Sequence, residues 1–156
     1  MANTMQAKDA VSAKLAECFA TIEGNRYLLM QAKSFEAKFE KEKQKISILG
    51  KTGQGNKATS WSGTGNMTIY HNTAIFNELM LRFKNTGEDV YFDIQVSNED
   101  STSAAGRQTM IFKGCNIDGG VLASFDADGD SLEQDVDFTF EDFEMPEKFK
   151  MLDGMM

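Results

Sequence analysis

The chain has 156 residues and is poor in the residues that build small catalytic or metal sites: one histidine, one proline, one tryptophan and two cysteines. A single histidine excludes a metal site built on a histidine cluster. Cys18 and Cys115 form no Cys-x-x-Cys pair, so we expect free, semi-buried thiols rather than a disulfide framework. We therefore predict no metal ion and no cofactor.

Long apolar runs are also missing. The longest, such as residues 27–30, span only a few positions, far short of the length that crosses a bilayer. Residues 1–9 lack the basic-then-apolar order of a secretory signal. We expect no membrane insertion by this chain, and we expect it to be made in the cytoplasm and to stay soluble there.

Acidic residues outnumber basic ones. The chain has 24 aspartates and glutamates and 16 lysines and arginines, which gives a formal net charge of −8. Tight nucleic-acid binding needs cations that displace counterions from phosphate, so the charge argues against it. It does not prevent DNA from passing nearby without sticking. An acidic surface also simply keeps a protein in solution.

Three patterns resemble catalytic or ligand motifs only in part. Gly50-Lys51-Thr52 lacks both the upstream glycine and the following helix of a phosphate-binding loop. Asp126-Ala127-Asp128-Gly129-Asp130 lacks the glycine and glutamate spacing of a calcium loop, so an acidic β-turn over 126–131 fits better. His71 has no nucleophile that sequence can pair with it. We predict that the chain is not an enzyme.

Alternating apolar and polar residues dominate the chain and predict antiparallel strands. Gly24-Asn25 supports a tight first hairpin. Residues 34–49 alternate but change phase near 41–45, which predicts a bulge, a twist or a face switch in a charged stretch outside the core. Further strands are expected at 61–71, 90–97, 108–117 with Gly114 as a bulge, and 133–143, with a turn at 118–120.

One amphipathic helix is expected over 73–84. Ile75, Leu79 and Phe83 lie four residues apart and form a single apolar stripe, while Gly87 can end the helix. Asn72 or Thr73 can cap its start. The sum is a mainly β, or β-dominated α+β, domain in which antiparallel sheets pack as a sandwich or open barrel.

Two segments stand out as candidate functional surfaces. Residues 51–60 form a polar, glycine-rich connection that is longer than a hairpin needs, and long loops in compact domains often carry function. Strand 133–143 has Val136, Phe138 and Phe140 on one face and a strongly acidic second face. The chain divides into a flexible N-terminal arm (1–17), a β domain (18–149) and a C-terminal tail (150–156).

Several stretches, taken in order, resemble the tail-tube proteins of contractile phage tails, defective prophages and R-type bacteriocins. They cover most of residues 11–149. The most specific is YFDIQVSNED at 91–100. The others are ATIEG at 20–24, KSFEAK at 33–38, ILG at 48–50, GTGNMTIY at 63–70 and FTFED at 138–142.

The resemblance implies a structural subunit of an inner tail tube. In that family two antiparallel sheets pack at an angle with a helix on one side, six copies form a ring around a lumen, and rings stack into a hollow tube. The implied partners are further copies of the chain and the sheath, tape-measure and baseplate proteins. The implied location is the bacterial cytoplasm during assembly, then a virion tail or a released tail-like particle.

The resemblance also suggests roles for the two surfaces. We expect the long connection to contact the next ring and the acidic strand face to line the lumen, where it would repel DNA phosphates. Alternatives are a secretion-system tube subunit and a monomeric β-barrel carrier of an apolar ligand. The expected ring-contact residues are Lys51, Thr52, Gly53, Gln54, Gly55, Asn56 and Lys57, and the expected lumen-facing residues are Glu133, Asp135, Asp137 and Glu141.

Overall fold

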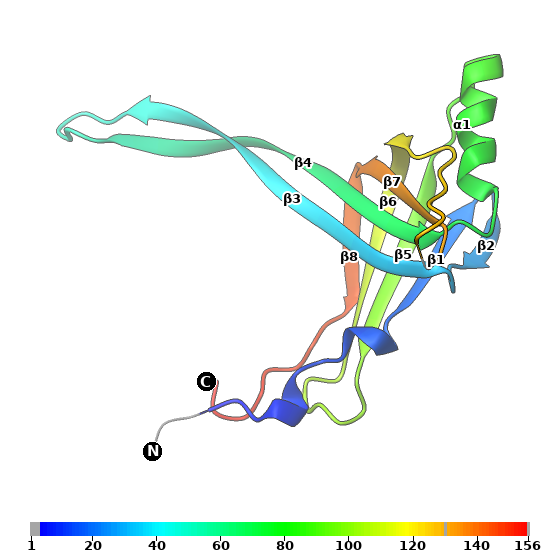
Figure 1. The fold of residues 1–156 in the computed structure, drawn as a ribbon. Coiled ribbons are helices and arrows are strands. Elements are labelled where there is room, and N and C mark those ends of the chain that lie inside the picture. The colour runs from blue at the N-terminus through cyan, green and yellow to red at the C-terminus, as the bar shows by residue number, and fades with distance from the viewer. Residues whose placement is uncertain (1–3, 130, 156) are drawn as a thin grey trace.

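A computed structural model describes residues 4–129 and 131–155 (Figure 1). The described chain is mostly antiparallel β-structure with one α-helix, as the sequence predicts. No helix among the described residues is long and apolar enough to cross a membrane. The elements are two 3₁₀ helices (Ala7–Asp9, Ala13–Leu15), β1 (Glu17–Ile22), β2 (Asn25–Leu28), β3 (Ala32–Ser47), β4 (Gln54–Tyr70), α1 (Ile75–Thr86), β5 (Phe92–Glu99), β6 (Arg107–Gly120), β7 (Glu133–Phe140) and β8 (Asp142–Glu147).

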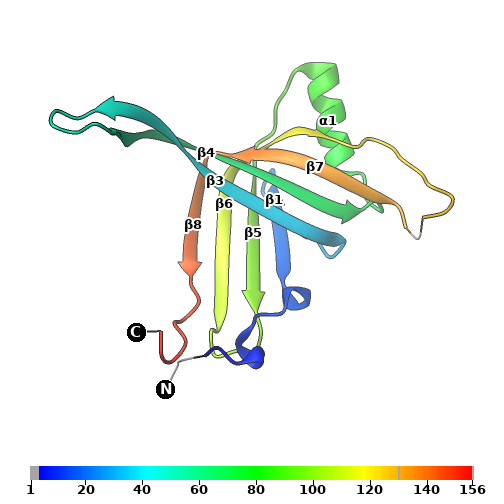
Figure 2. The ribbon, with the colours of Figure 1, turned by 60° about the vertical axis from the view of Figure 1, so that its left-hand side comes forward.

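The strands form two sheets that share β6. Their order is β2-β1-β5-β6-β7-β4-β3, and β8 pairs with β6 beside this path. In Figure 2 the strands β3, β4 and β7 run across the ends of β1, β5, β6 and β8 at a steep angle. Among the described strands the sheets do not close into a barrel, since β2 and β3, at the two ends of the order, each pair on one side only.

Strand β6 turns the corner between the sheets at Gly114. Its first part pairs with β5 and β8, and its end pairs with β7. The register against β5 shifts between Phe92 and Ile94, and Gly114 has a φ of +65°, a conformation that favours glycine. The predicted bulge is confirmed. The predicted turn at 118–120 is wrong, because these residues continue β6.

The core lies between the two sheets and under α1. Val136, Phe138 and Phe140 of β7 are buried, which confirms the predicted inward face. The predicted strand 133–143 is too long, however. Strand β7 ends at Phe140. The chain then bends and starts β8, whose Phe143 pairs with Phe112 of β6.

Local sequence signals closely predicted the turn of the first hairpin and the ends of α1. The turn of the first hairpin lies at Glu23 and Gly24, which both have positive φ, one residue earlier than predicted. Helix α1 ends at Gly87, whose N–H donates to the Phe83 carbonyl at 2.8 Å. At its start the backbone N–H of Ile75 donates weakly to Thr73 Oγ1, at 3.4 Å.

The apolar stripe of α1 is only partly buried. Phe76 is fully buried and Leu79 packs against the core, but Phe83 is 54% exposed. The stripe prediction is therefore wrong at the C-terminal turn, where Phe83 lines an open groove with Asp89 and Val90 instead of entering the core.

Strands β3 and β4 make a long hairpin that projects from the body (Figure 1). The predicted loop over 51–60 is wrong from residue 54 onward, because β4 already begins at Gln54. Residues 54–60 are exposed on both faces apart from the half-buried Gly55, so this segment carries no apolar alternation that would distinguish it from a loop. The phase change predicted near 41–45 is confirmed as a register shift between Glu42 and Lys43.

The predicted acidic turn over 126–131 is present at its start. Asp126 Oδ1 accepts the Asp128 N–H at 3.0 Å, and the Asp126 carbonyl accepts the Gly129 N–H at 3.0 Å. Asp130 lies outside the described residues, as do 1–3 and 156 of the predicted terminal segments.

Candidate assembly interface

The chain exposes much more surface than a compact monomer of its mass. Its solvent-accessible area is 11057 Å² for 17.3 kDa. The scaling found for monomeric proteins gives roughly 7,800 Å² at this mass. The excess of roughly 3,300 Å² is the size of the contacts that permanent assemblies bury.

The far part of the β3–β4 hairpin, which we call the extension (residues 40–60), is exposed along its whole length apart from the half-buried Gly55. A two-stranded hairpin with no third partner is marginally stable in water. Ile46, Ile48 and the fully exposed Leu49 place apolar side chains at its tip. The extension is therefore a candidate surface for binding another protein chain.

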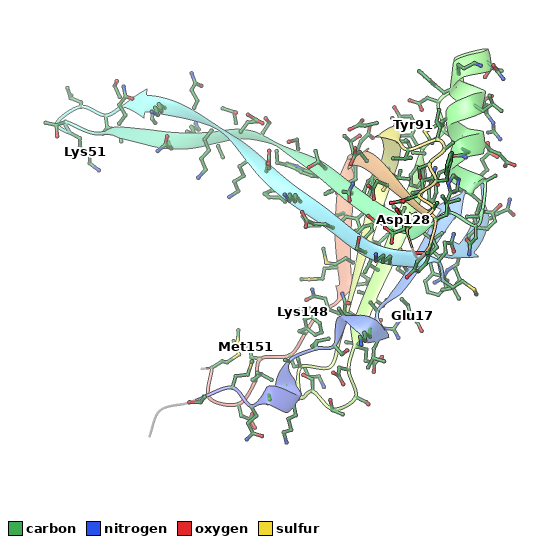
Figure 3. The ribbon with its side chains drawn as sticks, viewed as in Figure 1. Glu17, Lys51, Tyr91, Asp128, Lys148 and Met151 are labelled. Atoms are coloured by element: carbon green, nitrogen blue, oxygen red, sulfur yellow. The ribbon has the colours of Figure 1, made fainter. Side chains whose placement is uncertain are left out.

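The residues predicted to contact another ring all lie on the extension. Lys51, Thr52 and Gly53 form its turn, with Lys51 at the far end of the hairpin (Figure 3), while Gln54 to Lys57 lie on β4. Gly55 pairs with Ile46, and a Cβ at Gly55 would lie 2.9 Å from Ile48 Cδ1. The tip residues Ile46, Ile48 and Leu49 were not predicted as contacts, although their apolar character in a polar stretch was a usable signal.

Four aromatic rings anchor the base of the extension. Trp61 stacks on Phe39 with 5.2 Å between ring centroids, and the edge of Phe143 meets Trp61 at 5.6 Å. Phe140 continues the contacts toward Phe112 in the core at 5.0 Å. Because aromatic contacts of this kind stabilise by about 0.5–1.5 kcal/mol beyond area burial, the rings fix the direction in which the extension leaves the body.

The outer face of the β3-β4-β7 sheet is polar and mostly acidic. Lys33 Nζ donates to Glu133 Oε1 at 2.6 Å, and this hydrogen bond raises the pKa of Lys33. Thr68 Oγ1 donates to Asp135 Oδ1 at 2.6 Å, and Asn66 Nδ2 donates to Asp137 Oδ1 at 2.7 Å. These cross-strand bonds hold the carboxylates in a row on the sheet.

This acidic face is larger than the β7 row alone. Glu36 and Asp118 line a shallow hollow of about 380 Å³ beside Asp137, with Lys38 as the cation in it. The sequence reasoning missed both carboxylates, since their strands were not placed next to β7. Glu141 stands apart from the row, just beyond the end of β7, where its side chain lies over Gly114.

Both described ends of the chain meet the loop between β5 and β6, at the end of the molecule away from the extension (Figure 1). Asp100 Oδ2 accepts the Ser12 N–H at 3.1 Å, and Ser103 Oγ donates to the Asp9 carbonyl at 2.8 Å. The Lys150 N–H donates to the Ala105 carbonyl at 2.7 Å. The N-terminal segment is thus held to the body, while its expected flexibility stays a prediction.

Outside the extension and the acidic sheet face, few described groups lie in surroundings typical of a reactive site. Among the described residues, no group of three or more His, Cys, Asp or Glu side chains is placed to hold a metal ion. Burial raises the pKa of Cys18 and of Cys115 to about 12. His71 Nε2 lies 3.2 Å from Asn77 Nδ2 at the start of α1. The exposed extension and the acidic sheet face therefore remain the candidate functional surfaces.

Comparisons with known proteins show which family the chain resembles. A family sequence model described as phage tail tube protein matches residues 3–147. Over 144 residues the chain is 36% identical to the phage-like element PBSX protein XkdM of Bacillus subtilis (strain 168), covering 92% of this chain and 95% of that protein.

Two solved structures share the fold at low identity. A chain in the anti-feeding prophage baseplate gives a TM-score of 0.65 at 11% identity, covering 93% of this chain and 97% of that one. A chain of the SPP1 tail tube gives a TM-score of 0.62 at 10% identity, covering 91% of this chain and 81% of that one. The fold of this chain is therefore shared with a chain of the SPP1 tail tube.

Proposed function

Because this chain belongs to the phage tail tube protein family, we propose that it forms six-membered rings that stack into the hollow inner tube of a contractile phage tail or a phage-tail-like particle. Its role in the tail tube is structural. The observation that carries the finer proposal is the long, unpartnered extension on a fold that leaves its sheet edges open.

Open edges supply the contacts within a ring. The β3-β4-β7 sheet is bounded by β3 on one side and by the end of β6 on the other. A sheet edge exposes unpaired backbone groups, and pairing edges around a closed ring satisfies them. Six copies joined in this way bury the edges that a monomer leaves in water.

The acidic face then forms the wall of the lumen. Glu133, Asp135 and Asp137 point away from the core on the sheet that joins around the ring. A negative wall repels DNA phosphates, which would keep passing DNA from sticking. Lysines in place of Asp135 and Asp137 should leave the tube intact but make it retain DNA at low salt; tubes that still exclude DNA would contradict this assignment.

The expected partners are further copies of the chain, a surrounding sheath, a tape-measure protein inside the tube and a baseplate at its end. We place the chain in a virion tail or a tail-like particle, after synthesis in the bacterial cytoplasm. We also propose that it has no enzymatic activity. The carrier alternative finds little support, because aromatic rings fill the space between the two sheets.

Electron microscopy of the purified protein, concentrated near neutral pH, tests the proposal. Hollow rods or six-fold rings are expected. Rings of another symmetry would contradict the hexamer. If only monomers are seen, the test is repeated with short tube fragments added as seeds, and failure to extend those seeds would contradict tube formation by this chain.

A further inference from the structure

The apolar core continues past the last strand of the β3-β4-β7 sheet. Ile117, near the end of β6, packs against the core together with Leu79 and Val90. The same three residues line an open groove of about 300 Å³ between α1 and the end of β6, which we call the α1 groove, and Met80 and Phe83 extend its apolar wall. Because Phe83 is more than half exposed, this apolar surface is left uncovered in a single subunit.

The backbone beside the α1 groove has an open edge. The end of β6 pairs with β7 on one side, whereas on the other side β5 pairs with β6 only as far as Cys115. Residues 117–120 therefore present one edge without a strand. An open edge offers backbone N–H and C=O groups to an incoming strand. Edge and groove together can receive an extended chain, with hydrogen bonds from β6 and apolar contacts from α1.

Strand β3 carries a matching apolar face at the opposite edge of the sheet. One row of register partners crosses the sheet from β6 to β3: Ile117, Phe138, Gly65 and Ala37. Partners in register lie on the same face, so Ala37 and, two positions later, Phe39 lie on the core side with Ile117. Phe39 is 47% exposed. An apolar face at the β3 edge is thus also left partly uncovered in a single subunit.

Rotation about a ring axis brings these two edges together. Each neighbouring pair in the order β6-β7-β4-β3 is antiparallel, so β3 of one copy runs antiparallel to β6 of the next and the joined sheet keeps one pattern. In Figure 2 β3 and α1 lie on opposite sides of β4 and β7, so a subunit does not fill its own groove. Contacts between two different surfaces of identical copies form a closed ring when the rotation closes.

Charge favours the same occupant. Asp89 and Asp118 border the α1 groove, and none of its described lining residues is basic. Strand β3 holds five lysines and three glutamates and is therefore net positive, although the chain as a whole is acidic. Opposite charges on two facing surfaces steer their association and fix their register.

We infer that the α1 groove of each subunit receives β3 of a second copy of this chain, its neighbour in the ring. The inference rests on the proposed tube. The incoming strand pairs with residues 117–120 of β6, and its Ala37 and Phe39 face packs on Met80 and Phe83. Helix α1 then supports the joint between two subunits from the core side of the sheet.

A photoactivated cross-linker in place of Phe83 tests the inference. Subunits with Phe83→p-benzoylphenylalanine are copolymerised into rods with an excess of isotope-labelled wild-type protein and irradiated. We expect a covalent dimer in which mass spectrometry finds the linked peptide within β3 of the labelled chain. Leu81→p-benzoylphenylalanine is the matched control, because Leu81 is equally exposed on α1 but does not line the groove. It should give no link to β3.

The possible failures are distinct. Absence of rods from the wild-type protein, with or without seeds, would overturn the tube proposal itself. Rods in which the probe at position 83 forms no dimer, or links to a segment other than β3, would overturn the docking inference alone. Such rods would leave the groove free for a different protein.

A second readout is rod formation by single variants. Phe83→Asp should cause loss of rods but leave the subunit folded, because the replaced ring is largely exposed in the subunit. Leu81→Asp, which adds the same charge to α1 outside the groove, should leave rod formation unchanged. Rods from Phe83→Asp in wild-type yield would overturn the inference.

Discussion

The ring of Phe138 lies directly on Gly65 of the neighbouring strand. The two residues pair across β4 and β7, and a Cβ at Gly65 would stand 2.3 Å from the Phe138 ring. Gly63 and Phe140 repeat the arrangement two pairs further along, also at 2.3 Å. Neither glycine has a left-handed backbone, so it is space for the ring, not conformational freedom, that requires glycine here.

Gly65→Ala should therefore destabilise the fold. The added methyl group displaces the buried Phe138 ring, and overpacking of this kind costs about 1–3 kcal/mol. Thermal or urea unfolding of the two proteins measures the difference. Gly53→Ala is the matched control, because nothing lies within 4 Å of a Cβ there and its φ is not positive. Equal losses at both positions would contradict the explanation.

Trp61 reports on the base of the extension, because it is the chain's single tryptophan. Phe143→Ala removes the ring that makes a T-shaped contact with Trp61, so water reaches the indole and the fluorescence emission should shift to longer wavelength. We expect the unfolding free energy to fall by about 0.5–1.5 kcal/mol beyond the loss from area burial. Phe83→Ala, on the exposed turn of α1, should leave the emission unchanged; a shift there would show that the effect is not local.

Cys18 and Cys115 should resist thiol reagents in the folded protein. Burial raises the pKa of each to about 12, so neither forms thiolate at pH 8. Labelling with a chromogenic disulfide reagent should be negligible in buffer and should reach two thiols per chain in denaturant. Fast labelling of the native protein would contradict their burial.

The same thiols should make stability fall at high pH. The unfolded chain, with an ordinary cysteine pKa of 9.0, releases these protons before the folded chain does. The stabilisation is complete below pH 9 and is lost as pH rises toward 12, by about 1.4 kcal/mol per pH unit for each thiol. Denaturant titrations at several pH values should show a flatter dependence for the Cys18→Ala, Cys115→Ala double variant than for the wild type.

Asp100 should hold the N-terminal segment to the body. Its carboxylate accepts bonds from the Thr102 hydroxyl, the Thr102 N–H and the Ser12 N–H, in falling order of effect, and these lower its pKa. The stabilisation is present above pH 3.8, its ordinary value, and is lost as pH falls through the lower folded value. Asp100→Ala should speed proteolysis before Ser12. Asp126→Ala, which removes the equivalent turn bond to the Asp128 N–H far from that segment, should not.

Shortening the extension should block stacking but leave the subunit folded. Lys45 pairs with Asn56, so replacing residues 46–55 with Asn-Gly closes the hairpin with a two-residue turn. The variant should keep its circular dichroism and unfolding midpoint, because the removed residues have no contact with the core. Microscopy should show no rods. Normal rods from this variant would contradict a role for the tip in stacking.

Much of the local structure was predictable because its causes are local. Alternation along 136–140 depends only on the two-residue period of a strand, and Gly87 ends α1 because glycine adopts positive φ at no steric cost. The phase change near Glu42 and Lys43 was visible for the same reason. The acidic row on β7 also followed from alternation alone.

The tertiary structure decided how these pieces meet. The sequence did not show that β6 serves both sheets, that residues 54–60 extend β4 into water, or that both described ends of the chain border one cleft. Each depends on pairing between residues far apart in the chain, and such pairing leaves no periodic mark on either segment. Local propensity determined which residues form strands, whereas long-range packing decided which strands lie together and which surfaces stay open for a second copy.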